Sequence, residues 1–199
     1  MSEESTKQQR WNQRYQEKVS SEPAPATILK SYQQSLSTQE NAQRKALDLA
    51  CGLGGNAIYL AQQGYQVTAV DYSDVALSQL AKKAENAKLS IDTVLCDLEK
   101  DGAEDFKDFD LVVVSYYLQR SLFAKIFSFL KPGGLLFYQT FSGEQVDGVG
   151  PQNPDFRLKQ GELLSLCQPH LVLFYREDSS DCITEDCYRG EAMIVVKKN

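Results

Sequence analysis

The segment KALDLACGLGGNA, residues 45–57, joins three features that together predict one kind of site. An apolar stretch with strand character leads directly into a glycine-rich turn, and the turn leads into residues suited to the start of a helix. Glycines at positions 52, 54 and 55 permit positive φ and let a ligand approach the backbone without obstruction by Cβ atoms. The first N–H groups of the following helix favour negative or polar ligand atoms. The segment therefore indicates an α/β protein that binds a nucleotide-like ligand at this turn.

An acidic residue, Asp48, lies inside the expected strand. A carboxylate just before a turn that binds pyrophosphate would repel the ligand, whereas a cationic ligand would be attracted to it. Asp48 therefore favours a positively charged ligand, and capping of a neighbouring loop is the alternative role.

The rest of the chain alternates short apolar strands with helical segments, which predicts a parallel sheet covered on both faces. Gly64 is expected to end the helix after the glycine turn, and Ser73 to cap the next helix. Pro132-Gly133 fits a type II turn before a strand at 135–141. Further helices are expected at 8–19, 26–36 and 159–167, and closing strands at 171–175 and 192–197.

Five segments, in this order, resemble the motifs of the class I S-adenosylmethionine-dependent methyltransferases. They are the glycine turn at 45–57, VTAVDYS at 67–73, LCDL at 95–98, FDLVVVS at 109–115 and LKPGGLL at 130–136. Their order and spacing make the resemblance specific, although each motif alone is weak. The resemblance implies one α/β domain over residues 1–199 with a Rossmann-like fold. Its sheet would have seven mostly parallel strands, helices on both faces and an antiparallel last strand inserted between its neighbours.

The resemblance also implies S-adenosylmethionine as the cofactor and a partner for each part of it. Asp48 and the backbone of Ala50, Gly52 and Gly54 would hold the amino-acid end, and Asp71 would accept hydrogen bonds from the ribose hydroxyls. Tyr72 and Ser73 would line an edge of the adenine, which Asp97 and the Leu98 N–H would bind. Ser115 and Tyr116 would border the methyl group. The expected cofactor-binding residues are Trp11, Arg14, Asp48, Ala50, Gly52, Gly54, Asn56, Asp71, Tyr72, Ser73, Asp97, Leu98 and Ser115.

No catalytic residue is assigned, because methyl transfer is an in-line displacement that chiefly requires alignment and exclusion of water. The only histidine, His170, is expected at the start of a late strand, far from the ligand crevice. It is therefore not expected to act as a general base.

Two outlying segments, WNQRY at 11–15 and GPQNPDFRLKQGEL at 150–163, resemble the small bacterial tellurite-resistance and thiopurine-type methyltransferases. That resemblance implies that residues 1–40 form a helical lid, with Trp11, Arg14 and Tyr15 facing the cofactor. The alternative is a docking helix in which Trp11 and Tyr15 form only an apolar stripe. The resemblance also implies a small substrate, which is a chalcogen oxyanion, a thiol or another soft nucleophile. Two sets of side chains are candidates for its pocket. The aromatic set, which core packing explains equally well, is Tyr116, Tyr117 and Phe141, and the anion-attracting set is Arg120, Asn153 and Arg157.

Composition narrows the classes further. The chain has 199 residues, of which 42% are hydrophobic and 24% charged, so one globular domain is expected. A formal net charge of −6 argues against nucleic acid as a partner. Neither a signal peptide nor a membrane span is expected, which predicts a cytoplasmic protein. The protein is also expected to be either a monomer or a weak homodimer. Five cysteines without a paired framework indicate a reduced compartment, and Cys182 and Cys187 are expected to be loop thiols rather than metal ligands.

Two other functions remain open. Gly52-x-Gly54-x-x-Ala57 followed by Asp71 also satisfies the dinucleotide fingerprint of a nicotinamide-dependent oxidoreductase. Asp48, Asp97 and the lack of a second domain weigh against it. The third possibility is a protein that binds the cofactor without catalysis.

Overall fold

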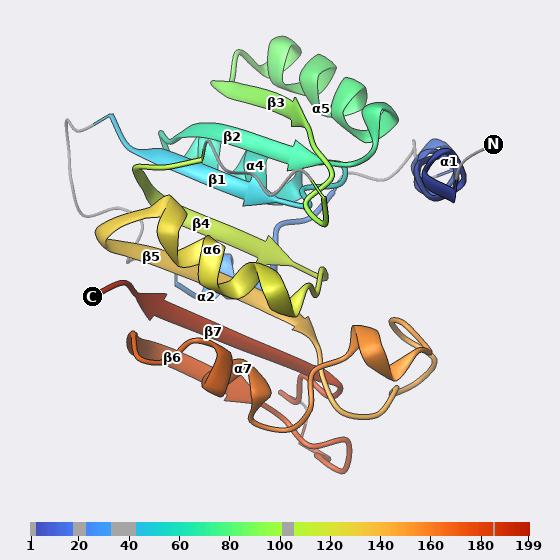
Figure 1. The fold of residues 1–199 in the computed structure, drawn as a ribbon, viewed down its shortest axis with the longest axis vertical. Coiled ribbons are helices and arrows are strands. Elements are labelled where there is room, and N and C mark those ends of the chain that lie inside the picture. Colours follow the sequence, from blue (N-terminus) through green and yellow to red (C-terminus); the bar gives the residue numbers. More distant parts are fainter. Residues whose placement is uncertain (1–2, 18–22, 33–42, 101–105, 185) are drawn as a thin grey trace.

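The structure is a computed structural model that describes residues 3–17, 23–32, 43–100, 106–184 and 186–199. Its centre is a seven-stranded sheet with the order β3-β2-β1-β4-β5-β7-β6 (Figure 1). β7 is antiparallel to both of its neighbours, and the other pairs are parallel. The predicted fold class is therefore confirmed, including the inserted antiparallel strand. The strands are β1 (Lys45–Leu49), β2 (Gln66–Asp71), β3 (Ile91–Leu95), β4 (Phe109–Ser115), β5 (Leu130–Phe141), β6 (Leu171–Glu177) and β7 (Glu191–Lys197).

Helices cover both faces of this sheet, as the alternating pattern predicted. The α-helices are α1 (Glu3–Glu17), α2 (Thr27–Ser31), α4 (Gly55–Gln62), α5 (Asp74–Ala87), α6 (Phe123–Phe129) and α7 (Glu162–Leu166), and there are 3-10 helices η1 (Arg120–Leu122) and η2 (Pro154–Phe156). Within the described residues, α2 and α7 are shorter than expected. The parts of the expected N-terminal helices and of the lid that fall at 18–22 and 33–40 lie outside the described residues.

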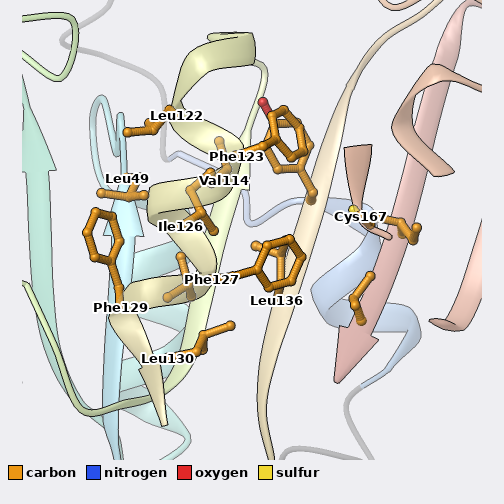
Figure 2. Packing of buried hydrophobic residues seen from close by; sticks show 14 of the residues in the cluster. Leu49, Val114, Leu122, Phe123, Ile126, Phe127, Phe129, Leu130, Leu136 and Cys167 are labelled. Atoms are coloured by element: carbon orange, nitrogen blue, oxygen red, sulfur yellow. The ribbon is translucent and has the colours of Figure 1, made fainter. Parts of the chain in front are cut away.

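The core has two layers because successive residues of each central strand point to opposite faces. In β4, Val112 and Val114 pack against α6, whereas Leu111 and Val113 pack on the face of α2, α4 and α5. Figure 2 shows α6 inserting its aromatic and aliphatic side chains between Leu49 of β1 and Leu136 of β5. Burying these apolar side chains fixes how β1 and β4 lie side by side, and that pair positions the site.

The chain reverses direction across the sheet between β1 and β4, since β2 and β3 lie on one side of this pair and β5 on the other. Ligands of open α/β sheets bind at such a point, outside the carboxyl ends of the strands. In Figure 1, α1 and the segment between β5 and α7 lie beyond this edge of the sheet.

The Pro132-Gly133 pair differs from the prediction, because it lies inside β5 instead of before a strand. Leu130 already pairs with Phe109, and the register shifts before Leu111 pairs with Leu135. Gly133 has the positive φ of 77° that a type II turn needs, so the expected turn is present as a bend within the strand.

The expectation of unpaired thiols at Cys182 and Cys187 is wrong, because these residues form a disulfide. Four residues lie between them in the sequence, and their Cα atoms are 6.0 Å apart, a distance that a disulfide can bridge. Asp178 lies beside the two sulfurs, which are bonded to each other. Along the described stretches of the chain, no helix combines the length and the apolar character that a bilayer crossing requires.

Candidate functional site

The glycine turn has the backbone geometry that its sequence predicted. Gly54 has φ of 80°, a left-handed value, and stands directly before α4 as its N-cap. Gly55 is required for a different reason, since a Cβ atom there would lie 2.4 Å from the Ala24 carbonyl oxygen. The segment before α2 therefore packs directly on the start of α4.

Asp48 is fully buried at the centre of the sheet, beneath this turn. Its Oδ1 accepts a long hydrogen bond of 3.4 Å from the Asn56 amide, and its Oδ2 has no partner within the described structure. Burial raises the pKa of Asp48 to about 7, against the opposing effect of Asn56 and the Ala57 backbone. An unpartnered buried carboxylate is costly, and a cationic ligand group would compensate it.

Asn56, a predicted site residue, connects three segments of the site. Its Oδ1 accepts the Ala26 N–H at 2.8 Å, and its Nδ2 donates to the Ser115 Oγ at 2.8 Å as well as to Asp48. The predicted residues Asp48, Asn56 and Ser115 therefore lie in one hydrogen-bonded group at the carboxyl ends of β1 and β4.

Asp71 lies at the carboxyl end of β2 and shapes the turn. Its two oxygens accept the N–H groups of Gly52 at 2.7 Å and Ser73 at 2.9 Å. Burial raises the pKa of Asp71, and these donors act against that rise. Each carboxylate oxygen accepts more than one hydrogen bond, so the contacts leave capacity for the two hydroxyls of a ribose.

Ser73 caps α5 as predicted, since its Oγ accepts the Ala76 N–H at 3.1 Å. Ser73 is fully buried, and its hydroxyl donates to the Asn12 Oδ1 at 2.6 Å. The hydroxyl thus accepts a hydrogen bond from α5 and donates one to α1, and the neighbouring Tyr72 carbonyl accepts from the Gln8 side chain of α1.

The loop after β3 comes close to the end of β2, because the Cys96 N–H donates to the Asp71 carbonyl at 3.1 Å. Asp97 accepts the Glu99 N–H at 3.0 Å, as a polar turn residue would. The Leu98 side chain belongs to the core. This arrangement places the backbone and the Asp97 carboxylate beside the residues expected to hold the ribose.

Helix α1 lies across the start of α5 and reaches the glycine turn. The Tyr15 hydroxyl lies 2.9 Å from the position that a Cβ atom would take on Gly52, so the ring covers the turn. Trp11 stacks on Tyr15 but remains 39% exposed, and Arg14 lies exposed over the Trp11 ring. Of the three residues expected to face inward, the structure brings Tyr15 to the turn. Binding of the cofactor by Trp11 and Arg14 stays a prediction.

The anion-attracting pocket expected from Arg120, Asn153 and Arg157 is not formed. Arg120 forms an ion pair with Glu162 at 2.6 Å, and the Asn153 side chain accepts the Asp155 N–H. Arg157 is only 4% exposed and donates to a ring of backbone carbonyls. Those carbonyls belong to Ser142, Gly143, Glu144, Val149, Pro151 and Gly190. These side chains hold the segment after β5 in place and leave little for an anion.

Sequence reasoning missed two functional candidates, Gln139 and Glu191. The Tyr116 hydroxyl lies 3.3 Å from both Glu191 carboxylate oxygens, and the Gln139 Nε2 lies 2.7 Å from Glu191 Oε2. An acid that opens the last apolar strand was the available signal for Glu191. Its place became clear only from the direction of β7. His170, as expected, lies at the opposite edge, where it packs on Phe127 at 4.0 Å.

Comparison with known proteins identifies the central part of the chain. Residues 46–134 match the family model described as a methyltransferase domain. A Geobacillus protein named as a methyltransferase is 31% identical over 137 residues, which are 63% of this chain and 55% of that protein. The "Probable S-adenosyl-L-methionine-dependent methyltransferase TehB" of Haemophilus influenzae Rd is 34% identical over 88 residues, 44% of this chain and 31% of that protein. The chain thus spans between about a third and just over half of these relatives.

Solved structures share the fold. The crystal structure of TehB from Haemophilus influenzae superposes with a TM-score of 0.65 and 23% identity, covering 86% of this chain and 61% of that one. The cyclase SpnF superposes with a TM-score of 0.66 at 17% identity, covering 96% of this chain and 94% of that one. The same fold therefore carries different reactions, and the reaction must be argued from the site.

Proposed function

We propose that this chain is a class I S-adenosylmethionine-dependent methyltransferase that transfers the cofactor's methyl group to a small acceptor molecule. The observation that carries this proposal is the unpartnered Asp48 Oδ2, fully buried under the glycine turn. A diphosphate in this place would meet a carboxylate, whereas the ammonium group of an amino-acid moiety would compensate it. The nicotinamide alternative is therefore disfavoured.

The described residues fit each polar part of the cofactor. Asp48 and the backbone at Ala50, Gly52 and Gly54 would hold the amino-acid end, and Asp71 the ribose. Asp97 and the Leu98 N–H would hold the adenine. When bound, S-adenosylmethionine supplies an electrophilic methyl group on a positively charged sulfur. Tyr15 over the turn would exclude water from this group and restrict its orientation.

The acceptor is proposed to be a small soft nucleophile, and a thiol fits better than a chalcogen oxyanion, because the side chains expected to attract an anion are engaged elsewhere. Two observations support a compact acceptor. Tyr116 and Phe141 pack against each other with ring centroids 5.1 Å apart at the carboxyl ends of β4 and β5. The net charge of −6 disfavours a polyanionic substrate.

A thermal-shift titration tests the cofactor assignment. We expect S-adenosylhomocysteine, the product that retains the amino-acid end, to raise the melting temperature in a saturable manner, because it binds only the folded protein. NADH should leave the melting temperature unchanged at equal concentration. Stabilisation by NADH but not by S-adenosylhomocysteine would overturn the proposal.

A further inference from the structure

Tyr116, Gln139 and Glu191 form a polar cluster that the cofactor does not need. The Gln139 side chain is fully buried and fixed at both ends. Its Oε1 accepts the Ile28 N–H at 3.0 Å, and its Nε2 donates to Glu191 Oε2 at 2.7 Å and to the Tyr116 hydroxyl at 3.1 Å. The cluster is therefore held rigidly, and Glu191 receives two donors that orient its carboxylate.

The cluster lies next to the methyl side of the proposed cofactor site. Tyr116 directly follows Ser115, whose Oγ binds Asn56, and the Tyr116 N–H donates to the Gln139 carbonyl at 2.8 Å. The register pairs Ser115 with Gln139, and Phe141 with Glu191. Polar groups thus continue along the carboxyl ends of β1, β4 and β5 to the start of β7. The cofactor residues lie on the β1 to β3 side, so the acceptor belongs on the Glu191 side.

The charges around this place disfavour an anionic acceptor. Arg157 is the nearby cation, and its charge interacts with Glu191, but its guanidinium N–H groups are directed at backbone carbonyls. Arg120 is paired with Glu162. Tyr188 adds a second phenol beside Tyr116. An oxyanion here would therefore face the Glu191 carboxylate, while the guanidinium groups of Arg120 and Arg157, which were expected to attract it, are engaged elsewhere.

We propose that Glu191 is a general base in the methyl transfer, and that the acceptor is a neutral thiol or hydroxyl compound instead of an oxyanion. This inference rests on the proposed function. A Glu191 oxygen takes the proton from the acceptor's sulfur or oxygen, and the freed lone pair forms the bond to the methyl carbon. The electron pair of the broken sulfur–methyl bond stays on the departing sulfur, which becomes neutral. The proton is later released from Glu191 to solvent, so atoms and charges balance.

Tyr116 is a positioning residue in this arrangement. It has a positive φ of 55°, and it is 48% exposed, so its ring reaches from the strand end toward solvent. Burial and the Glu191 charge both raise the pKa of Tyr116, which keeps the hydroxyl protonated as a donor to the carboxylate. Its backbone strain is consistent with a functional place.

The central experiment compares two thiol probes. 2-Mercaptoethanol carries a proton at neutral pH, whereas thionitrobenzoate is already ionised. We expect Glu191→Gln to lower kcat/KM for 2-mercaptoethanol by roughly 100-fold or more, the usual effect of a lost general base. The rate with thionitrobenzoate should not fall, because this probe needs no deprotonation and the variant no longer places a negative charge beside it. Glu85→Gln, which removes one exposed negative charge on α5, is the matched control and should leave both rates unchanged.

A second readout separates positioning from packing. Tyr116→Phe removes the hydroxyl that donates to Glu191 and should lower kcat/KM for 2-mercaptoethanol more than for thionitrobenzoate, because only the first probe needs the oriented carboxylate. Equal loss on both thiols would remove the positioning role of Tyr116. Thermal melting of each variant verifies folding, and Glu191→Asp replaces Glu191→Gln if the latter fails to fold. Glu191→Asp, which keeps a carboxylate, should then retain more activity on 2-mercaptoethanol than Glu191→Ala.

The outcomes separate this inference from the proposed function. A wild-type protein that does not bind S-adenosylhomocysteine contradicts the proposed function itself. A protein that binds it overturns only the Glu191 inference in three cases. These are equal loss on both thiols, no methylation of any protonated thiol or hydroxyl probe, and methylation of selenite or tellurite that Glu191→Gln leaves undiminished.

Discussion

At the scale of single residues, Asp48 opposes folding in the unliganded protein and favours binding of a cation. Its pKa is raised from the ordinary value of 3.8 to about 7 by burial. A raised pKa means that the folded chain holds this proton more tightly than the unfolded chain. This proton therefore contributes about 4 kcal/mol, as an order of magnitude, to the free energy of unfolding below about pH 4. The contribution is lost as the pH rises through 7.

The first prediction is that Asp48→Asn has opposite effects on stability and on binding. Near pH 8 the variant should melt at a higher temperature than the wild type, because the nearly isosteric amide removes a buried charge. Its affinity for S-adenosylhomocysteine should fall at least tenfold, and the wild-type affinity, unlike that of the variant, should rise between about pH 6 and 8.

Calorimetric titration over this pH range measures both affinities. Asp92→Asn, on the exposed part of β3, provides the control and should change neither property. Unaltered affinity after the substitution at position 48 would show that the carboxylate does not contact the ligand.

The same scale shows where sequence reasoning succeeded and where it failed. The places of Asp48 and Asp71 beside the glycine turn could be predicted, because each lies in or at the end of an apolar strand, while their contacts with the cofactor stay a prediction. Glu191 could not, because its side chain reaches the crevice only when β7 runs antiparallel between β5 and β6. The ties of Arg157 were equally hidden, since its carbonyl partners come from the segment after β5 and from Gly190.

At the scale of elements, α1 is attached by side chains more than by an apolar face. Asn12 donates to Asp74 at 2.6 Å and accepts from the Ser73 hydroxyl. Lys7 pairs with Glu99 at 2.6 Å, but both side chains are substantially exposed, so this pair contributes little. Polar attachments of this kind suit an element that opens and closes.

The second prediction follows from this attachment. Asn12→Ala should weaken S-adenosylhomocysteine binding about five- to thirtyfold, since it removes two hydrogen bonds of about 1 kcal/mol each that hold Tyr15 over the turn. The melting temperature should hardly change, because α1 contributes little to the core. Hydrogen exchange over residues 7–17 should become faster.

Gln13→Ala is the matched control, because among the residues that the structure describes the Gln13 side chain hydrogen-bonds to Glu17 of the same helix. Equal binding by both variants would mean that α1 is a docked helix with no part in holding the ligand. The sequence left these two roles open, since the spacing of Trp11 and Tyr15 satisfies both.

Element boundaries were predicted less well than element types. α7 begins at Glu162 because Gly161 has a left-handed φ of 70°, so residues 159–161 form a turn instead of a helical start. The disulfide between Cys182 and Cys187 was also missed, because five-residue spacing alone does not bring two thiols together. The start of α7 and the pairing of the two cysteines both depend on local backbone geometry, which weak composition signals do not reveal.

At the scale of the whole molecule, the seven-stranded sheet with its inserted antiparallel strand was predictable, because five motifs of one fold appear in order along the chain. The proposed acceptor site was not, since it depends on segments that meet only after folding. The two sheet edges, β3 and β6, each leave apolar side chains exposed, Leu95 on one edge and Leu171 and Leu173 on the other. Charged neighbours such as Asp92 and Glu177 limit edge-to-edge pairing.

The third prediction concerns assembly. At micromolar concentration, sedimentation equilibrium should give the monomer mass of 22.3 kDa, because the exposed edge residues are few and the net charge of −6 opposes association. Any dimer should be weak and should dissociate on dilution. A dimer that persists at nanomolar concentration would contradict this prediction and direct attention to β3 and β6.

The unpartnered oxygen of Asp48 also has a consequence for the protein's survival in a cell. A chain that gains much of its robustness from a bound metabolite is degraded sooner when that metabolite is scarce, because proteases act on opened molecules. We therefore expect its abundance to follow the supply of S-adenosylmethionine, so that starvation for methionine would deplete the protein as well as its methyl donor.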